Sequence, residues 1–152
     1  GLGMVVNPSS QSVPERKLGR PADSDSTDTR ERILRNACER FAAEGFEGTT
    51  NKDIAEKAQV SSAALYHYFP SKADMYIAVC DSITESFSTV FQKVADCSPT
   101  LEGRMTALFA EVGRLGDESP EIVGFITGIS AVLRKHPEVS RGADAFGAHY
   151  RA

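Results

Sequence analysis

Residues 50–72 read TNKDIAEKAQVSSAALYHYFPSK and contain the signals for two short helices joined by a tight turn. Thr50, followed three residues later by Asp53, forms a capping pattern that begins the first helix. Ser61 is a suitable N-cap for the second helix, and only two residues separate the helices. Helices joined by so short a connection must cross steeply, which predicts a helix-turn-helix.

The second helix of this pair has one small and polar face. A helical wheel places Ser62, Ala63, Tyr66 and His67 on that face, and Leu65 on the opposite side, toward the core. A helix that enters a DNA major groove needs small residues near its N-terminus, followed by hydrogen-bonding groups that reach bases or phosphates. The pattern therefore indicates a recognition helix.

Upstream of the pair we predict one longer helix. It begins at Asp28, which forms a capping box with Glu31, and it ends at Gly45. Residues 1–27 lack periodicity and are expected to form a flexible arm. The basic run RKLGR at 16–20 fits either a contact in a minor groove or a solvated tail.

Downstream, helical patterns continue to the end of the sequence. Ser71 begins a long helix, and Ser98-Pro99 and Ser119-Pro120 begin two more, with a proline just inside each start. His136-Pro137 interrupts the chain before a last amphipathic piece. Since no strand pattern competes, we expect an all-α fold.

Composition excludes several classes of protein. The formal charge of −4 argues against a chain that is basic throughout, although DNA contacts depend on where the positive groups lie. The three cysteines have no metal-like spacing, and their odd number fits no complete disulfide framework. No apolar run reaches the length of a membrane span, and the N-terminus lacks the regions of a signal peptide. We therefore expect a cytoplasmic protein with no metal and no cofactor.

Four runs of residues suggest a known family. They are TRERIL at 29–34, FAAEGF at 41–46, TTNKDIA at 49–55 and VSSAALYHYFPSK at 60–72. In this order and spacing they resemble the DNA-binding domain of the tetracycline-repressor (TetR) family. The resemblance implies a three-helix DNA-binding domain over 28–72 and a helical domain for effector binding and dimerisation over 73–152.

The resemblance also implies a function and its residues. Family members are transcriptional regulators, most often repressors that bind palindromic operator DNA as homodimers and are released by a small-molecule effector. Carried over by position, the residues expected to approach DNA are Thr50, Asn51, Lys52, Ser61, Ser62, Ala63, Tyr66, His67, Tyr68 and Lys72. Tyr66 and Lys72 are expected at phosphates, and Ser62, Ala63 and His67 at base edges. Whether such a regulator represses or activates is not fixed by these residues.

An effector cavity would be lined by apolar residues of the second domain. The candidates are Phe87, Phe91, Met105, Phe109, Phe125, Ile126 and Ile129. Their chemistry suggests an apolar or aromatic effector. For any single one of them, packing in an ordinary helical core is the simpler interpretation.

Two features depart from the family pattern. Gln59 stands in the turn between the helices, where members usually carry glycine. If this position needs a positive φ, Gln59 stores strain of about 1 kcal/mol. The sequence also stops at Ala152, before the two helices through which members dimerise, so we expect the second domain to be incomplete.

Two other classes of function compete with a regulator. An enzyme would need a nucleophile beside a base, but the wheels place Cys38 on the inward stripe and His67 on the outward face, so no catalytic residue is predicted. A helical protein-interaction module is the second alternative. In that case Tyr66, His67 and Tyr68 would meet a protein partner, and binding would respond less steeply to salt.

Overall fold

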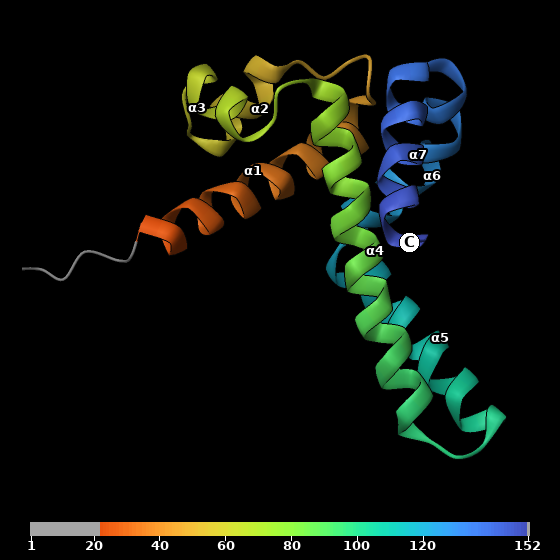
Figure 1. The fold of residues 1–152 in the computed structure, drawn as a ribbon. Coiled ribbons are helices and arrows are strands. Elements are labelled where there is room, and N and C mark those ends of the chain that lie inside the picture. The colour runs from red at the N-terminus through yellow and green to blue at the C-terminus, as the bar shows by residue number, and fades with distance from the viewer. Residues whose placement is uncertain (1–21, 152) are drawn as a thin grey trace, which may run out of the picture.

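The computed structural model describes the backbone of residues 22–151 and the side chains of residues 25–144. This part of the chain is all-α, as predicted, and contains no strand. Its helices are α1 (Ala22–Glu44), α2 (Asn51–Ala58), α3 (Ser62–Tyr68), α4 (Lys72–Cys97), α5 (Leu101–Glu118), α6 (Pro120–Lys135) and α7 (Pro137–Arg151) (Figure 1).

Three predicted N-caps are confirmed. The hydroxyl oxygens of Thr50, Ser61 and Ser71 accept hydrogen bonds from the backbone three residues onward, at 3.1, 3.0 and 3.1 Å. Each satisfies an amide that would otherwise lack a partner in the first turn of its helix. The starts of α2, α3 and α4 are therefore fixed by their local sequence.

Two predicted helix starts are wrong. α1 begins at Ala22, not at Asp28, because neither proline nor glycine interrupts residues 22–44 and the helix propagates back toward Pro21. Of the predicted arm, residues 1–21 lie outside the described residues. α5 is capped by Thr100, whose hydroxyl accepts from Gly103 N at 3.1 Å, so Pro99 precedes the helix. Pro120 does occupy the start of α6, as expected.

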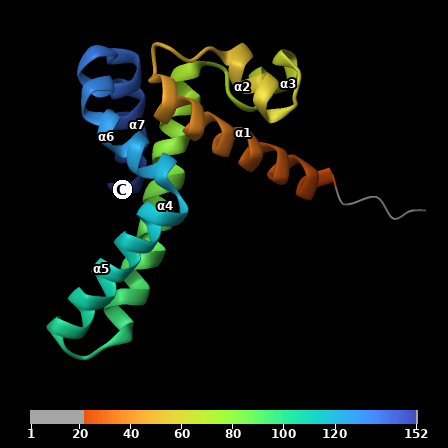
Figure 2. The ribbon, with the colours of Figure 1, turned by 180° about the vertical axis from the view of Figure 1, so that it is seen from behind.

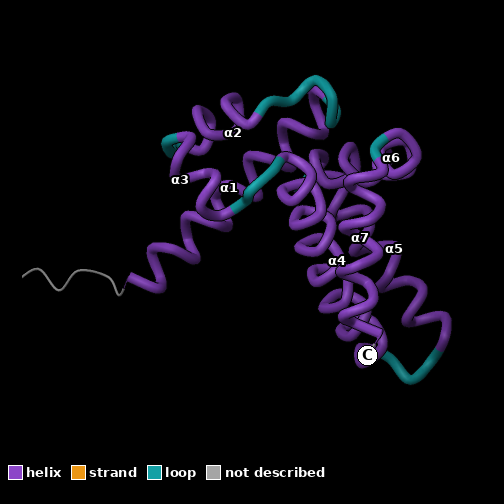
Figure 3. Tube along the Cα trace, turned by 45° about the horizontal axis from the view of Figure 1, so that its top comes forward, coloured by secondary structure: helices purple, strands orange, loops and turns teal. Residues whose placement is uncertain are grey.

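The helices are arranged around α4. In Figure 1, α4 runs through the length of the molecule, α1 crosses it near one end, and α2 and α3 pack beside α1. Figure 2, seen from behind, shows α6 between α1 and α5, while α5 accompanies the far half of α4. The connections are short apart from residues 45–50 between α1 and α2 (Figure 3). Since α4 starts directly after α3, any tilt of α4 moves the helix pair.

An aromatic cluster lies where these helices meet. Phe41 of α1, Tyr76 of α4 and Phe125 of α6 are all buried, with ring centroids 5.1 Å apart for Phe41–Tyr76 and 4.7 Å for Tyr76–Phe125. Phe46, from the connection after α1, joins them at 5.4 Å from Tyr76. The buried core therefore runs without a break from the helix pair into α6.

Candidate nucleic-acid interface and cavity

The N-terminus of α2 is built from a complete capping box. The Thr50 hydroxyl accepts from Asp53 N, and the Asp53 carboxylate accepts from Thr50 N, both at 3.1 Å. These hydrogen bonds with Thr50 hold the pKa of Asp53 below its ordinary value, and nearby Arg40 and Lys52 lower it further. The result is a fixed helix N-terminus whose dipole favours an anion such as a phosphate.

The turn after α2 depends on Gln59. Its φ of 58° and ψ of 43° place it in the left-handed region. This agrees with the expectation for a position at which the family usually carries glycine. Gln59 N donates to Glu56 O at 3.2 Å and Val60 N donates to Ala55 O at 3.0 Å, which is the Schellman pattern. Arg32 of α1 donates from Nε to Ala58 O at 2.9 Å, so α1 also holds the end of α2.

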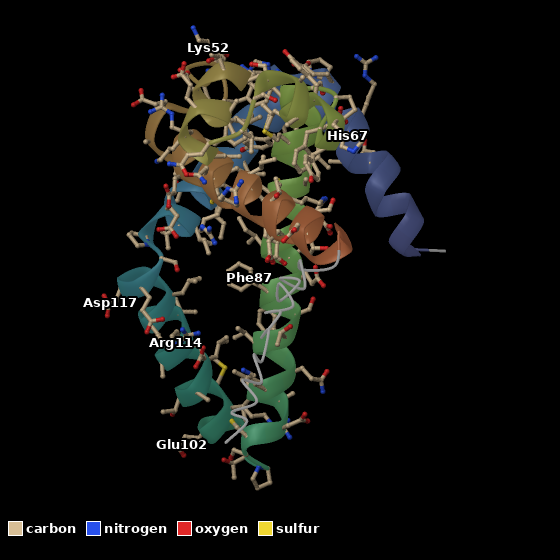
Figure 4. All side chains as sticks on the ribbon, turned by 90° about the vertical axis from the view of Figure 1, so that its left-hand side faces the viewer. Lys52, His67, Phe87, Glu102, Arg114 and Asp117 are labelled. Atoms are coloured by element: carbon tan, nitrogen blue, oxygen red, sulfur yellow. The ribbon has the colours of Figure 1, made fainter. Side chains whose placement is uncertain are left out.

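α3 presents the face expected of a recognition helix. Ser62, Ala63, Tyr66 and His67 are exposed on one side, and Leu65 is fully buried on the other. Figure 4 shows His67 and Lys52 at the same end of the molecule, far from α5. The helix pair therefore offers a continuous outward surface with small residues at the start of α3.

Two of the predicted contact residues are tied to neighbours. Asn51 Nδ2 lies 3.3 Å from the Tyr66 hydroxyl, which joins the start of α2 to the exposed face of α3. Tyr68 is half-buried, and its hydroxyl lies 3.2 Å from the Ser26 hydroxyl of α1. Tyr68 thus turns toward α1 and away from the face formed by Ser62 and Tyr66.

Lys72 is also held within the protein. Its Nζ donates to the Phe46 carbonyl at 2.7 Å and lies 4.4 Å from the centroid of the Phe46 ring. His136, between α6 and α7, packs on the same ring at 4.5 Å, and its Nε2 lies 3.1 Å from Glu47 Oε1. This junction was not predicted from sequence, because its residues are far apart in the chain.

A small apolar cavity lies between α4, α5 and α6. Its volume is about 90 Å³, and most of its lining is apolar. The lining residues are Ile83, Ser86, Phe87, Val90, Phe91, Leu108, Glu111, Val112, Arg114, Leu115 and Ile122. Figure 4 shows Phe87 projecting from α4 toward the side of the molecule that α5 and α6 occupy.

Only Phe87 and Phe91 of the seven predicted cavity residues line this space. Phe125 belongs to the aromatic cluster, and Ile129 packs against the core. Met105, Phe109 and Ile126 are exposed. Helical periodicity places these residues on apolar faces without indicating which face encloses a cavity.

The charged residues at this cavity form ion pairs on α5. Arg114 contacts Glu111 at 2.8 Å and Glu118 at 2.7 Å. The hydrogen bond from Arg114 lowers the pKa of Glu111, and the two glutamates raise the pKa of Arg114. Within the lining, Glu111 and Arg114 are therefore paired with each other, and Glu118, outside the lining, leaves the group of three with one net negative charge.

A larger cleft lies between α1, α4 and the start of α6. Its volume is about 350 Å³. Leu34, Cys38 and Val79 form an apolar floor, whereas Glu31 and Arg35 of α1 are exposed at its margin. Burial raises the pKa of the Cys38 thiol to about 11, with Glu121 and Glu39 adding to the effect. Its burial and raised pKa make the Cys38 thiol slow to react at neutral pH.

The part of the chain that the structure describes lacks two kinds of feature. No group of three or more His, Cys, Asp or Glu side chains is placed to hold a metal ion. No helix in the same part of the chain has the length and apolar character needed to cross a bilayer.

Sequence comparisons agree on one family. Residues 33–79, from α1 to the first part of α4, match the family described as "Bacterial regulatory proteins, tetR family". The chain is 30% identical over 116 residues to the transcriptional regulator TcmR of Streptomyces glaucescens, covering 72% of this chain and 48% of TcmR. It is 31% identical over 86 residues to the transcriptional repressor KstR2 of Mycolicibacterium smegmatis, covering 57% of this chain and 42% of that repressor. The chain spans about half the length of these curated relatives.

Solved structures share the fold. The ketosteroid transcriptional regulator KstR2 of Mycobacterium tuberculosis superposes with a TM-score of 0.64 at 24% identity, covering 80% of this chain and 62% of that one. A regulator from Shewanella superposes with a TM-score of 0.62 at 23% identity, covering 76% of this chain and 59% of that one. At these identities the likeness concerns the arrangement of the helices alone.

Proposed function

Because the chain belongs to the tetR family of bacterial regulatory proteins, we propose that it is a cytoplasmic transcriptional regulator that responds to a small molecule. It binds a palindromic operator as a homodimer and blocks transcription, and a small apolar or aromatic effector releases it. The observation that carries the proposal is the outward face of α3, held in place by the capped α2 and the Gln59 turn.

The proposed contacts follow from exposure and chemistry. Ser62 and Ala63 allow α3 to approach the major groove closely, and His67 reaches a base edge one turn later. Tyr66 donates its hydroxyl to a phosphate, with Asn51 beside it. Lys52 is exposed at the start of α2 and supplies a further positive charge.

Lys72 takes a modified role in this proposal. An ammonium carries three donors, and the Phe46 carbonyl occupies one of them. The remaining donors are available for a phosphate at the start of α4. A phosphate bound by Lys72 would therefore lie next to the hydrogen bond between Lys72 and the Phe46 carbonyl.

α4 provides the route from effector to operator. It begins at Lys72 directly after the helix pair, and Ile83 and Phe87 on the same helix line the small cavity. An effector that prefers the orientation of α4 in which the two recognition helices do not fit the operator lowers DNA affinity. A coupling of about 1–3 kcal/mol is typical of such effects.

The test is a fluorescence-anisotropy titration against DNA taken from immediately upstream of the chain's own gene, at two salt concentrations. We expect saturable binding that survives competitor DNA and weakens steeply with salt. A double variant, Ser62→Ala with His67→Ala, should lose the preference for this DNA over scrambled duplex while its helix content stays unchanged. If DNA affinity changed neither with the salt concentration nor with the DNA sequence, the alternative of a protein-interaction module would be favoured. Sedimentation of the free chain and of its complex then gives the stoichiometry.

A further inference from the structure

The small cavity and the larger cleft adjoin one another. The cavity lies between α4, α5 and α6, and the cleft lies between α4, α6 and α1. Ile83, Ser86 and Ile122 line both spaces. The two spaces therefore meet across these three side chains, and Ser86 is the exposed one among them.

The volumes of the cavity and the cleft limit the ligands that each can hold. Pockets for organic ligands usually measure about 300–1,000 Å³. The cavity, at about 90 Å³, holds only a few heavy atoms, whereas the adjoining cleft measures about 350 Å³. A ligand of ordinary size that uses the apolar cavity must therefore extend beyond it, and the adjoining cleft offers the space.

We propose that the effector is an elongated, mainly apolar molecule with an uncharged, oxygen-bearing polar end. Its apolar end fills the cavity, and its polar end lies in the cleft against α1. This inference rests on the proposed function, since it names the class of effector and the way in which it reaches the DNA-binding domain.

The lining of the cavity selects an apolar end. Phe87, Phe91 and Val112 surround it, and its charged groups, Glu111 and Arg114, are paired with each other. An unpaired charge buried here would lose its hydration without gaining a partner. Hydrocarbon or aromatic groups gain free energy from the same burial.

The margin of the cleft disfavours an anionic end and offers hydroxyl partners to an uncharged one. Glu31 and Arg35 lie one turn apart on α1, so their charges offset each other. Glu121 lies in the first turn of α6, where the helix dipole favours a carboxylate. Hydroxyl groups, which both donate and accept, supply the remaining polarity: Ser82, Ser86 and Ser119. A ligand hydroxyl or ketone matches this set.

The position of the polar end has a consequence for regulation. Leu34 and Cys38, which form the α1 side of the cleft, belong to the helix that also holds α2 through Arg32. A ligand between α1 and α4 therefore changes the separation of α1, which holds the end of α2, from α4, which follows α3 in the chain. A ligand confined to the cavity would act on α4 alone.

The first test fills the boundary at which the cavity and the cleft meet. Ser86→Trp fills it with a side chain at an exposed position of α4, and Ser88→Trp places the same group on α4 at an exposed position outside both linings. The probes are the straight-chain alcohols from butan-1-ol to dodecan-1-ol, measured by displacement of the uncharged dye N-phenyl-1-naphthylamine. For the natural chain and Ser88→Trp, affinity should rise about threefold to fourfold per added methylene along the whole series. For Ser86→Trp the rise should stop at the short alcohols.

The second test reads the cleft directly in the natural chain. Iodoacetamide alkylation at about pH 9 is followed separately for each cysteine by peptide mass spectrometry, with exposed Cys97 as the internal control. Long alcohols should slow alkylation of Cys38 and leave Cys97 unchanged, and short alcohols should slow neither. Dodecanoate should bind several-fold more weakly than dodecan-1-ol, because the lining of the cleft has one more carboxylate than guanidinium groups.

The outcomes separate the two proposals. If affinity reaches its limit with the short alcohols in the natural chain, or Cys38 is not protected by the long ones, the two-part site is wrong while effector binding in the cavity stands. If no alcohol displaces the dye at any length, the apolar effector of the proposed function is wrong as well. Should Ser86→Trp fail to fold, as judged by its circular dichroism, the protection of Cys38 in the natural chain decides the question.

Discussion

Lys72 donates a hydrogen bond of 2.7 Å from Nζ to the carbonyl oxygen of Phe46, and the same ammonium lies 4.4 Å from the centroid of the Phe46 ring. Phe46 belongs to the connection before α2, and Lys72 is the first residue of α4. The two ends of the helix-turn-helix are thereby joined to each other. Because His136 packs on the same ring, the junction also touches the end of α6.

Lys72→Met keeps the length of the side chain and removes its charge. The Phe46 carbonyl then loses a charged donor in a partly buried position, so we expect the free energy of unfolding to fall by about 1–3 kcal/mol. Urea denaturation followed by circular dichroism measures it. Lys52→Met, at an exposed position of α2, is the control and should stay within about 0.5 kcal/mol of the natural chain. Equal stability of the two variants would contradict the junction.

Gln59→Gly should stabilise the protein. Gln59 holds a φ of 58°, which costs a residue with a side chain about 1 kcal/mol and costs glycine little. We expect a gain of about 0.5–1 kcal/mol in urea denaturation. Gln92→Gly, inside α4, should lose a similar amount, since glycine weakens a helix interior. A loss of stability in Gln59→Gly would show that its exposed side chain makes a contribution that the strain does not outweigh.

These two sites differ in how far sequence predicts them. Gln59 stands out because members of the family it resembles usually carry glycine in this turn, whereas the caps at Thr50, Ser61 and Ser71 follow from the local sequence. Each of these caps and turns is determined by a few consecutive residues, about six at most. The bond from Lys72 to Phe46 spans 26 positions, and it forms only because the core brings α4 back against the end of α1.

The cavity shows the same limit from another side. Periodicity groups the apolar residues of the second half on helix faces. It does not distinguish a face that lines a cavity from a face that packs in the core. Phe125 was grouped with Phe91, yet Phe125 is 2% exposed in the aromatic cluster and Phe91 is 56% exposed beside the cavity. The difference depends on how α6 packs against α1 and α4 and how α5 packs against α4, which no local pattern encodes.

Phe125→Ala and Phe91→Ala should separate these two roles. Removing Phe125 leaves a hole against Phe41 and Tyr76, so we expect a loss of about 3–5 kcal/mol of stability, with the protein close to unfolding. Removing Phe91, which is largely exposed already, should cost about 1 kcal/mol or less. Binding of the dye N-phenyl-1-naphthylamine should weaken in Phe91→Ala. Comparable losses of stability in the two variants would place Phe91 in the core.

Asp53→Asn tests the capping box through its pH dependence. The native pKa of Asp53 lies below its ordinary 3.8, chiefly because of its hydrogen bonds with Thr50, so the ionised carboxylate stabilises the folded state. That contribution is complete above the ordinary pKa and disappears as the pH falls through the lowered native value. The melting temperature of the natural chain should therefore exceed that of Asp53→Asn at neutral pH, and the two curves should converge in acid below about pH 4. A difference that persists undiminished at the lowest pH would mean that the carboxylate charge is not the cause.

Lys52→Gln and Ser62→Ala distinguish charge from sequence reading at the DNA surface. A lysine that neutralises one phosphate contributes about one unit to the slope of log affinity against log salt. Lys52→Gln should therefore lower that slope by about one per protomer, or about two for the proposed homodimer, and weaken every duplex alike. Ser62→Ala removes a hydroxyl from the start of α3 without changing charge, so the slope should stay constant while the ranking of operator variants changes. Anisotropy titrations over four salt concentrations and a set of single-base operator variants measure both quantities. If Lys52→Gln altered the ranking and Ser62→Ala altered only the slope, the proposed docking of α2 at the backbone and α3 in the groove would have to be reversed.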